Sequence, residues 1–369
     1  MSDTLSGVCI LDLTRMLAGP YGSMILADMG AEVIKVEPPD GGDPMRAMGP
    51  PFLEGHTSAY FLSINRNKKS VTLDLQQPGG RDAFLRLVEH ADAVIENYRP
   101  GVPRRLGIDY DSCQARKPDI VYCSVSGFGQ DGPYRDLPAF DLILQAMGGG
   151  MSITGEPEGA PVRAGIPLGD LAGGMFAATA ICGALWRRQQ TGQGQYIDIS
   201  LLDAQVSMLS YVAQYYLTNG KVPGPSGTAH QSVTPYRAFR AKDIWIVVAV
   251  FVERHWGAFC QAAGLPHLEE DERFATNAAR LEHRAELEAL LEKRFASKSG
   301  DEWIKRLWQA GVPAGPINTI DRVLRDPQVL HRQMLTSLSR PHPIAGTQPV
   351  LGSPIKVGGD EEFLPSPLL

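Results

Sequence analysis

The chain has 369 residues, of which 43% are hydrophobic and 21% charged. This composition is typical of a soluble globular protein, and the length exceeds one ordinary core, so two domains are expected. A formal net charge of -6 argues against a nucleic-acid-binding or membrane-surface protein, and no apolar run is expected to reach the roughly 20 residues that span a bilayer. Five cysteines, spaced far apart, indicate free thiols and a cytoplasmic location.

The first 130 residues alternate strand-like and helix-like segments. Buried apolar strands that alternate with amphipathic helices predict an α/β fold, with a mostly parallel sheet covered on both faces. The expected strands are 8–14, 32–37, 70–75, 93–98 and 120–126, and the expected helices between them include 21–29 and 81–90.

A helix rich in Ala and Gly is predicted over 171–188, and a strand follows at 196–200. Gly and Pro then cluster over 219–227, and this change of composition marks a domain boundary. The N-terminal part of a large α/β domain should therefore occupy 1–218.

A smaller α+β domain is expected after the boundary, over 225–320. Its predicted elements are a strand at 245–250 and helices at 284–295 and 302–310. The remaining segment, 321–369, contains another strand-like run near 349–357.

The loop after the first strand, 13–20, is where a dinucleotide-binding fold would carry Gly-x-Gly-x-x-Gly. That fingerprint is absent, and Pro20 stands in the turn, so NAD and FAD are not expected. The loop is either a plain connection with an exposed Arg15 or a ligand-binding loop at the carboxyl end of a strand.

Two groups of basic residues flank predicted strands. Taken singly, each residue is best explained as a solvated surface charge. Together, in an acidic protein, they favour a polyanionic ligand such as coenzyme A, whose phosphates need guanidinium or ammonium donors. The residues are Arg66, Lys68 and Lys69 before the third strand, and Arg99, Arg104 and Arg105 after the fourth.

Asp170 follows Gly169 and directly precedes the Ala- and Gly-rich helix. Two interpretations are open. Asp is a favoured N-cap residue, and residue physics alone favours that explanation. However, a helix N-terminus also keeps a carboxylate ionised, glycines admit a bulky ligand, and an accessible carboxylate can attack an acyl group.

His230, with Thr228 and Ser232 nearby, either binds a substrate or belongs to a polar loop. No cluster of His, Cys and carboxylates has the spacing of metal ligands, so no metal is expected. A Gly-x-Ser-x-Gly nucleophile elbow is also absent.

Ordered motifs spread over nearly the whole chain resemble those of the class III CoA-transferase family, which includes formyl-CoA transferase and carnitine CoA-transferase. Because the motifs are numerous and keep the family's order, the resemblance is specific. The matching segments are 11–15, 18–20, 30–37, 65–70, 96–101, 126–130 and 169–170.

The resemblance implies an interlocked homodimer whose subunits each have a large Rossmann-like domain and a small domain. It also implies that the C-terminal segment, 321–369, returns to the large domain. It implies that the Asp170 carboxylate attacks the donor thioester to form a mixed anhydride, which the CoA thiolate converts to an aspartyl-CoA thioester. The acceptor carboxylate then repeats the sequence in reverse. CoA is accordingly a substrate, and no tightly bound cofactor is expected. Residues matching the family's CoA contacts are Leu17, Ala18, Leu73, Asn97, Tyr98, Arg99 and Arg105, to which we add Arg15.

Within the family, 227–236 looks like the branch that uses succinyl-CoA and dicarboxylic acids such as glutarate, itaconate or malate. Arg163, seven residues before Asp170, also resembles that branch. A cation at this position could hold the distal carboxylate of the acceptor. The substrate-binding candidates are Arg163, His230, Ser232 and Phe140.

Two other functions stay open. An α-methylacyl-CoA racemase shares the fold but needs bases placed for proton transfer. In that group a histidine precedes the aspartate that corresponds to Asp141, whereas this chain has Phe140, which weakens the racemase hypothesis. A non-catalytic acyl-CoA-binding protein would keep only the scaffold, and an intact Asp170 in its glycine-rich setting argues against it.

Overall fold

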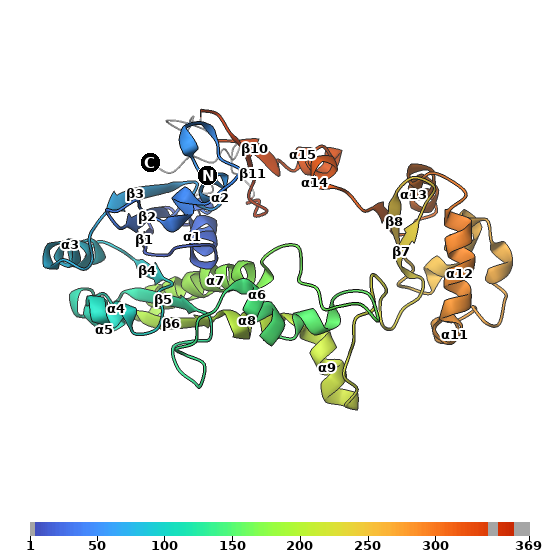
Figure 1. Cartoon of the computed structure of the whole chain (residues 1–369), viewed down its shortest axis with the longest axis horizontal. Coiled ribbons are helices and arrows are strands. Elements are labelled where there is room, and N and C mark those ends of the chain that lie inside the picture. Colours follow the sequence, from blue (N-terminus) through green and yellow to red (C-terminus); the bar gives the residue numbers. More distant parts are fainter. Residues whose placement is uncertain (1–3, 339–345, 358–369) are drawn as a thin grey trace. The chain divides into compact units, whose positions relative to one another are not determined.

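The computed structural model describes residues 4–338 and 346–357, which form two compact units (Figure 1). Residues 152–162 group with unit 2, although we predicted them in the large domain. Residues 339–345 and 358–369 of the predicted C-terminal segment lie outside the described residues. Unit 1 takes its described residues from 1–151, 163–221 and 327–369, and unit 2 from 152–162 and 222–326.

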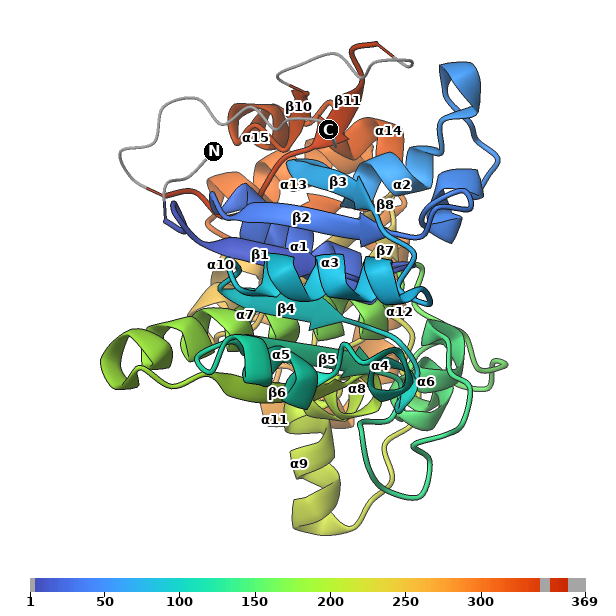
Figure 2. The same cartoon turned by 90° about the vertical axis from the view of Figure 1, so that its left-hand side faces the viewer.

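Unit 1 is built on a six-stranded sheet in the order β3-β2-β1-β4-β5-β6 (Figure 2). Each neighbouring pair of strands is parallel, which confirms the predicted α/β fold. In this doubly wound order the winding reverses between β1 and β4. The strands are β1 (Cys9–Asp12), β2 (Glu32–Glu37), β3 (Lys68–Thr72), β4 (Ala93–Glu96), β5 (Val121–Ser126) and β6 (Gln195–Ser200).

The two faces of the sheet carry separate apolar cores, because successive side chains of a strand point to opposite faces. Ile10 and Ile95 belong to one core and their neighbours Leu11 and Val94 to the other. Figure 2 shows α3 and α5 in front of the sheet. Helices α1 (Ala18–Asp28) and α7 (Leu168–Thr191) cover the first face, and α3 (Pro78–Val88) and α5 (Tyr110–Arg116) cover the second. The other helices of unit 1 are α2 (Ala59–Ile64), α4 (Val102–Leu106), α6 (Asp141–Met147), α8 (Leu201–Met208), α9 (Ser210–Asn219) and α15 (Pro327–His331).

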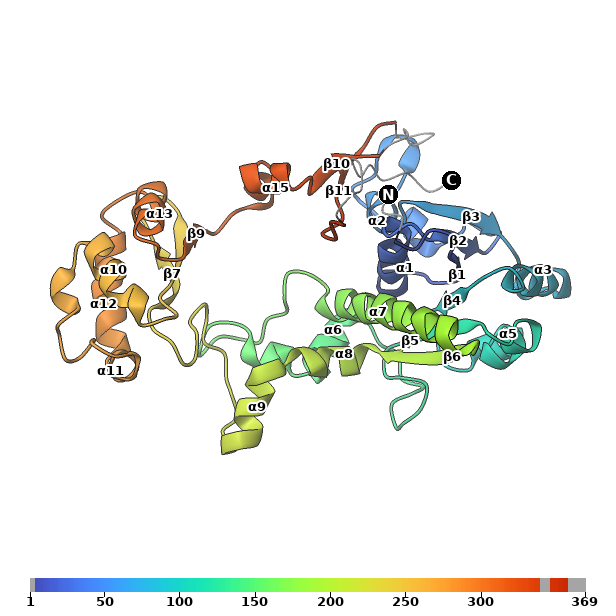
Figure 3. The ribbon, with the colours of Figure 1, turned by 180° about the vertical axis from the view of Figure 1, so that it is seen from behind.

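Helices α1 and α7 meet through their backbones (Figure 3). A Cβ on Gly22 would lie 2.7 Å from the carbonyl oxygen of Gly174. A Cβ on Gly174 would lie 2.5 Å from the carbonyl oxygen of Ala18. Neither site has room for a side chain, and this contact brings the N-terminal turns of the two helices together.

Helix α7 is, among the described residues, the one helix long and apolar enough to cross a membrane by length and composition, with a mean hydropathy of 1.5 over its best window. The expectation that no apolar run reaches this length is therefore wrong, because Ala and Gly make up so much of the helix that its apolar character is hard to see in the sequence. Half of the window is buried inside the structure, where Ala177, Ile181 and Leu185 pack in the first core. The packing is that of a core helix.

The last described part of the chain packs on unit 1. Strands β10 (Leu335–Ser337) and β11 (Pro349–Leu351) pair antiparallel. Leu338 and Val350 are buried against Leu62 of α2. The strand-like run predicted near 349–357 is therefore a strand only at its start, and it forms a separate two-stranded sheet.

Unit 2 combines a three-stranded antiparallel sheet with helices. Phe239 of the sheet packs with Phe295 and Trp303 of two helices in one core, so the unit has the predicted α+β character. Its strands are β7 (Tyr236–Arg240), β8 (Trp245–Ala249) and β9 (Ala314–Pro316). Its helices are α10 (Arg254–Ala263), α11 (Asn277–Glu282), α12 (Arg284–Phe295), α13 (Gly300–Gln309) and α14 (Ile320–Val323).

Candidate active site

A cavity of about 560 Å³, which we call the main cavity because Asp170 lines it, lies in unit 1 at the carboxyl ends of β1 and β4. The winding of the sheet reverses between these two strands, and open α/β sheets bind their ligands at such a point. The loops after both strands and the N-terminus of α7 contribute to the wall. The predicted site residues that line it are Leu17, Ala18, Asn97, Tyr98, Arg99, Phe140, Arg163 and Asp170.

Arg15, Leu73 and Arg105 line a second cavity, of about 320 Å³, and Tyr98 lines both. The Arg15 guanidinium lies 5.1 Å from the centroid of the Tyr98 ring. Asn97 fixes the backbone of Arg15, because its Nδ2 donates to the Arg15 carbonyl oxygen (2.7 Å) and its Oδ1 accepts from the Arg15 N–H (2.8 Å). The structure thus divides the predicted CoA contacts between two cavities that share one tyrosine.

Two buried lysines hold the loop after β1 from inside the protein. Lys35 Nζ donates to the Thr14 carbonyl oxygen (2.6 Å), and Lys68 Nζ donates to that of Pro20 (2.9 Å). Lys68 also pairs with Asp12 at 2.9 Å, and burial lowers the pKa of Lys68 to about 8. These lysines therefore support the loop from its buried side, where a ligand cannot reach them.

The first basic group of the sequence analysis does not face either cavity. Lys68 is fully buried, Arg66 pairs with the buried Asp28, and Lys69 pairs with Glu32 at the surface. The interpretation of this group as a phosphate-binding cluster is therefore wrong. The sequence showed the charges but not their carboxylate partners, which come from other elements.

Asp170 occupies the third position of α7, whose N-cap is Pro167. The cap is supplied from outside the helix. Asp141, the first residue of α6, accepts hydrogen bonds on Oδ1 from the N–H groups of Gly169 (2.8 Å) and Asp170 (3.3 Å). The N-cap interpretation of Asp170 is therefore wrong. Within 4–338 and 346–357 no donor hydrogen-bonds its carboxylate.

Burial, and then the negative charge of Asp141, raises the pKa of Asp170 to about 7. We expected the helix N-terminus to keep this carboxylate ionised. That expectation considered only the helix dipole, whereas the fold half-buries the group and places a second carboxylate beside it. The nucleophilic, ionised form is consequently populated near neutral pH and dominates above it.

Asp141 is the functional candidate that sequence reasoning missed, since it entered only in the comparison with racemases. Its side chain is buried, and the residue that it caps, Gly169, is 28 positions away. No local pattern predicts a cap at that separation. An aspartate at the start of a helix was the available signal in the sequence. It could not show that Asp141 caps α7, a different helix.

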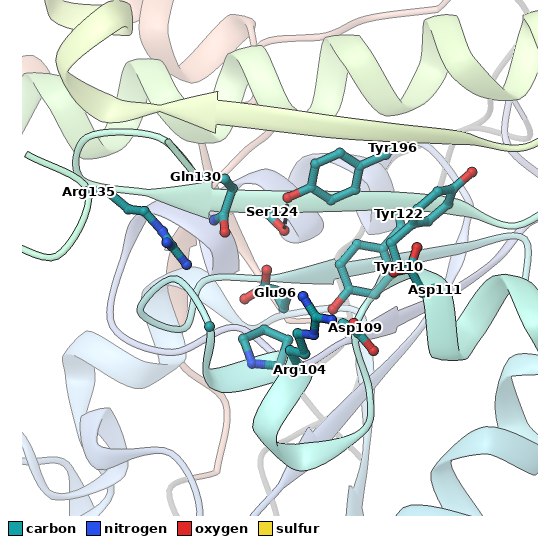
Figure 4. A pocket seen from close by; sticks show the side chains of 12 residues that line it. Glu96, Arg104, Asp109, Tyr110, Asp111, Tyr122, Ser124, Gln130, Arg135 and Tyr196 are labelled. Carbon is teal, nitrogen blue, oxygen red and sulfur yellow. Dashed lines mark hydrogen bonds between the residues drawn. The ribbon is translucent and has the colours of Figure 1, made fainter. Parts of the chain in front are cut away.

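A third cavity, of about 290 Å³, adjoins the main one, and Arg135 lines both. Figure 4 shows Glu96, at the end of β4, directed into this cavity beside Ser124. Burial raises the pKa of Glu96 to about 7. Its Oε2 accepts a hydrogen bond from the Tyr98 N–H (2.8 Å), so a buried carboxyl fixes the backbone of the tyrosine that lines the first two cavities.

His230 and Ser232 belong to unit 2. The Ser232 N–H donates to Nδ1 of His230 (3.1 Å), and Asn277 Nδ2 donates to the Ser232 carbonyl oxygen (2.9 Å). These contacts fix the loop before β7. The expected part of both residues in substrate binding stays a prediction.

Known proteins resemble the chain over nearly its full length. Residues 5–367 match the model of the family described as CoA-transferase family III. The succinyl-CoA:glutarate CoA-transferase of Mus musculus is 41% identical over 367 residues, which cover 99% of this chain and 84% of that protein. The succinyl-CoA:mesaconate CoA-transferase of Haloarcula hispanica is 38% identical over 372 residues, which cover 98% of this chain and 91% of that protein. A solved structure of a CAIB/BAIF family protein from Brucella suis matches with a TM-score of 0.88 at 39% identity. The match covers 100% of this chain and 96% of that one. This chain belongs to CoA-transferase family III and is a class III CoA-transferase.

Proposed function

We propose that the enzyme transfers CoA from succinyl-CoA to a dicarboxylic acid, with Asp170 as the covalent nucleophile. One observation carries the proposal. The Asp170 carboxylate lines the main cavity, makes no hydrogen bond within the described residues, and has a pKa raised to about 7. The names of the two enzymes compared above support succinyl-CoA as the donor and a dicarboxylate as the acceptor.

In this reaction the group bonded to the carboxyl carbon of Asp170 is exchanged twice. An oxygen of Asp170 attacks the thioester carbonyl, the C–S bond breaks, and CoA leaves as a thiolate from a mixed anhydride. The thiolate attacks the Asp170 carbonyl, which releases succinate and leaves an Asp170-CoA thioester. The acceptor carboxylate then displaces the thiolate, and the thiolate attacks the acceptor carbonyl of the second anhydride. The new acyl-CoA departs, and Asp170 regains its carboxylate with no net gain or loss of protons.

The two cavities that share Tyr98 suit the two ends of the donor. Arg15 and Arg105 beside the second cavity provide guanidinium groups for the CoA phosphates. The main cavity would then hold the thioester beside Asp170. Leu73 offers an apolar surface in the second cavity, which suits a ligand that carries a nucleoside as well as phosphates.

The acceptor end of the proposal depends on Arg163. This exposed arginine lines the main cavity together with Asp170 and Phe140. Its guanidinium could pair with the carboxylate that does not react, which favours dicarboxylic over monocarboxylic acceptors. His230 and Ser232 are proposed to contribute to the choice of acceptor. The enzyme is proposed to be a homodimer in the cytoplasm.

The test offers succinyl-CoA with glutarate, itaconate, malate, mesaconate or butyrate and separates the CoA esters by chromatography. We expect dicarboxylyl-CoA products in preference to butyryl-CoA. Asp170→Asn should lower turnover by at least about a thousandfold without lowering the Tm, because the side chain makes no hydrogen bond to lose and its buried charge is removed. Equal use of butyrate and glutarate would contradict the acceptor class, and an active Asn variant would contradict the nucleophile.

The same assay separates the two other functions. A racemase would exchange the α-hydrogen of an acyl-CoA with solvent deuterium and would need no acceptor. A carrier would bind CoA and form no new ester. Neither outcome is expected.

A further inference from the structure

Gln145 is a buried amide one turn along α6 from Asp141, with 3% of its surface exposed. Its Nε2 donates to Oδ2 of Asp141 (2.6 Å), and its Oε1 accepts from the Ala164 N–H (2.9 Å). Nε2 also lies 3.4 Å from the carbonyl oxygen of Ile166. A single side chain thus joins α6 to the segment that runs from Arg163 to the start of α7.

The contacts continue from Gln145 to the nucleophile. The oxygen of Asp141 that does not face Gln145 accepts from the N–H groups of Gly169 and Asp170. The result is an unbroken path from the Ala164 N–H through two buried side chains to the backbone of Asp170. Hydrogen bonds in such a low-dielectric setting strengthen one another, and an unmet partner is costly there.

The direction of each hydrogen bond along this path is fixed, which we call its fixed polarity. The Ala164 N–H can only donate, so the amide oxygen of Gln145 must face it and the amide nitrogen must face Asp141. The N–H groups at the start of α7 also donate only, so Asp141 must present an acceptor at that end. Each of the two side chains has one orientation that satisfies every group.

We infer that Gln145 is a positioning residue for CoA transfer, which orients Asp141 and through it fixes Asp170 and the Arg163 segment. The inference rests on the proposed function of Asp170. Gln145 itself does not line the main cavity, so it acts only through its neighbours.

The fixed polarity makes the inference testable by exchanging the two groups. In Asp141→Asn the new amide nitrogen meets that of Gln145, so two donors face each other. In Gln145→Glu a second carboxylate meets that of Asp141, so two acceptors face each other. In the double variant, Asn at position 141 accepts from the Gly169 N–H and donates to Glu at position 145, which accepts from the Ala164 N–H. The Ala164, Gly169 and Asp170 N–H groups then keep their acceptors, and only the 3.4 Å contact with the Ile166 carbonyl oxygen loses its donor.

We expect each single variant to lower kcat by about 10- to 100-fold and to lower the Tm. The double variant should recover the Tm and raise kcat at least about tenfold above the poorer single variant. The KM for succinyl-CoA should change by less than about twofold, because the loops after β1 and β4 line both CoA cavities. A double variant no better than the poorer single one would overturn the inference.

Gln145→Met and Gln205→Met form a matched pair. Both glutamines are buried, but Nε2 of Gln205 has no hydrogen-bond partner in the described structure. Assayed well below the Tm, Gln145→Met should lose kcat while Gln205→Met keeps it. Wild-type kcat in Gln145→Met would show that Gln145 only fills space and would overturn the inference. The proposed function fails separately, through an active Asp170→Asn enzyme.

Discussion

Asp141 and Asp170 are two carboxylates with opposite surroundings. Asp141 is buried and accepts hydrogen bonds from Gln145 and from two backbone N–H groups. Asp170 lines a cavity and accepts none within the described residues. A pair of titratable groups whose environments differ in this way divides structural and chemical work between its members. In the proposed mechanism, Asp141 is the structural carboxylate and Asp170 is the nucleophile.

The first prediction concerns the pH dependence of kcat/KM. Because burial and Asp141 raise the pKa of Asp170 to about 7, kcat/KM for succinyl-CoA should rise with pH until about 7 and then level off. Asp141→Asn removes the neighbouring negative charge, so the rise should move to lower pH. A profile already flat at pH values near the ordinary carboxyl pKa of 3.8 would contradict this account.

A second prediction concerns stability and Glu96. Burial raises the pKa of Glu96 from 4.5 to about 7. Between these values the folded protein binds more protons than the unfolded chain, so the free energy of unfolding should fall as pH rises through this window. Glu96→Gln keeps an acceptor for the Tyr98 N–H and should remove a pH dependence on the order of 3 kcal/mol.

Denaturant unfolding near both ends of that window would measure the Glu96 effect. Glu54→Gln, at an exposed residue, is the matched control and should keep the wild-type difference. An identical pH dependence in wild type and Glu96→Gln would refute the prediction.

At the scale of elements, α1 and α7 depend on glycines for their contact. Gly174→Ala places a methyl group 2.5 Å from the Ala18 carbonyl oxygen, so the helices must separate. We expect a loss of about 2–4 kcal/mol in the free energy of unfolding, in the range of severe overpacking. Gly183→Ala, on the same helix but with nothing within 4 Å of the new Cβ, should instead gain up to about 1 kcal/mol. Equal effects of the two substitutions would contradict the proposed close approach.

The strands and the long helices could be predicted because their apolar patterns are local. The predicted strand at 32–37 and the predicted helix at 284–295 agree with β2 and α12 residue for residue. The start of α7 was placed three residues late, at 171 instead of 168. Its cap comes from Asp141, and no pattern near Asp170 could report that contact.

The site could be predicted only in part, for the same reason. The motif residues after β1 and β4 do meet at one end of the sheet, because parallel strands bring their carboxyl ends together. Lys68 was misinterpreted because its partners, Asp12 and the Pro20 carbonyl, belong to other elements. The raised pKa of Asp170 is likewise a property of the fold.

At the scale of the whole molecule, helix α9 suggests a second copy of the chain. None of its ten residues is buried, and its large side chains lie in the open: Tyr211, Tyr216 and Leu217 are 51%, 46% and 72% exposed. A helix this short gains little stability in water without an apolar face against a partner. We predict an obligate homodimer, measured by light scattering at micromolar concentration. A folded, active monomer would refute it.

A covalent bond between Asp170 and CoA is the central step of the proposed mechanism. Incubation with succinyl-CoA and no acceptor, followed by intact-mass analysis and peptide mapping, tests for it directly. We predict an adduct with the mass of CoA on Asp170 that hydroxylamine releases, and no adduct in Asp170→Asn. A wild-type enzyme that turns over but never carries CoA on Asp170, or an Asn variant that carries the same adduct, would contradict the account.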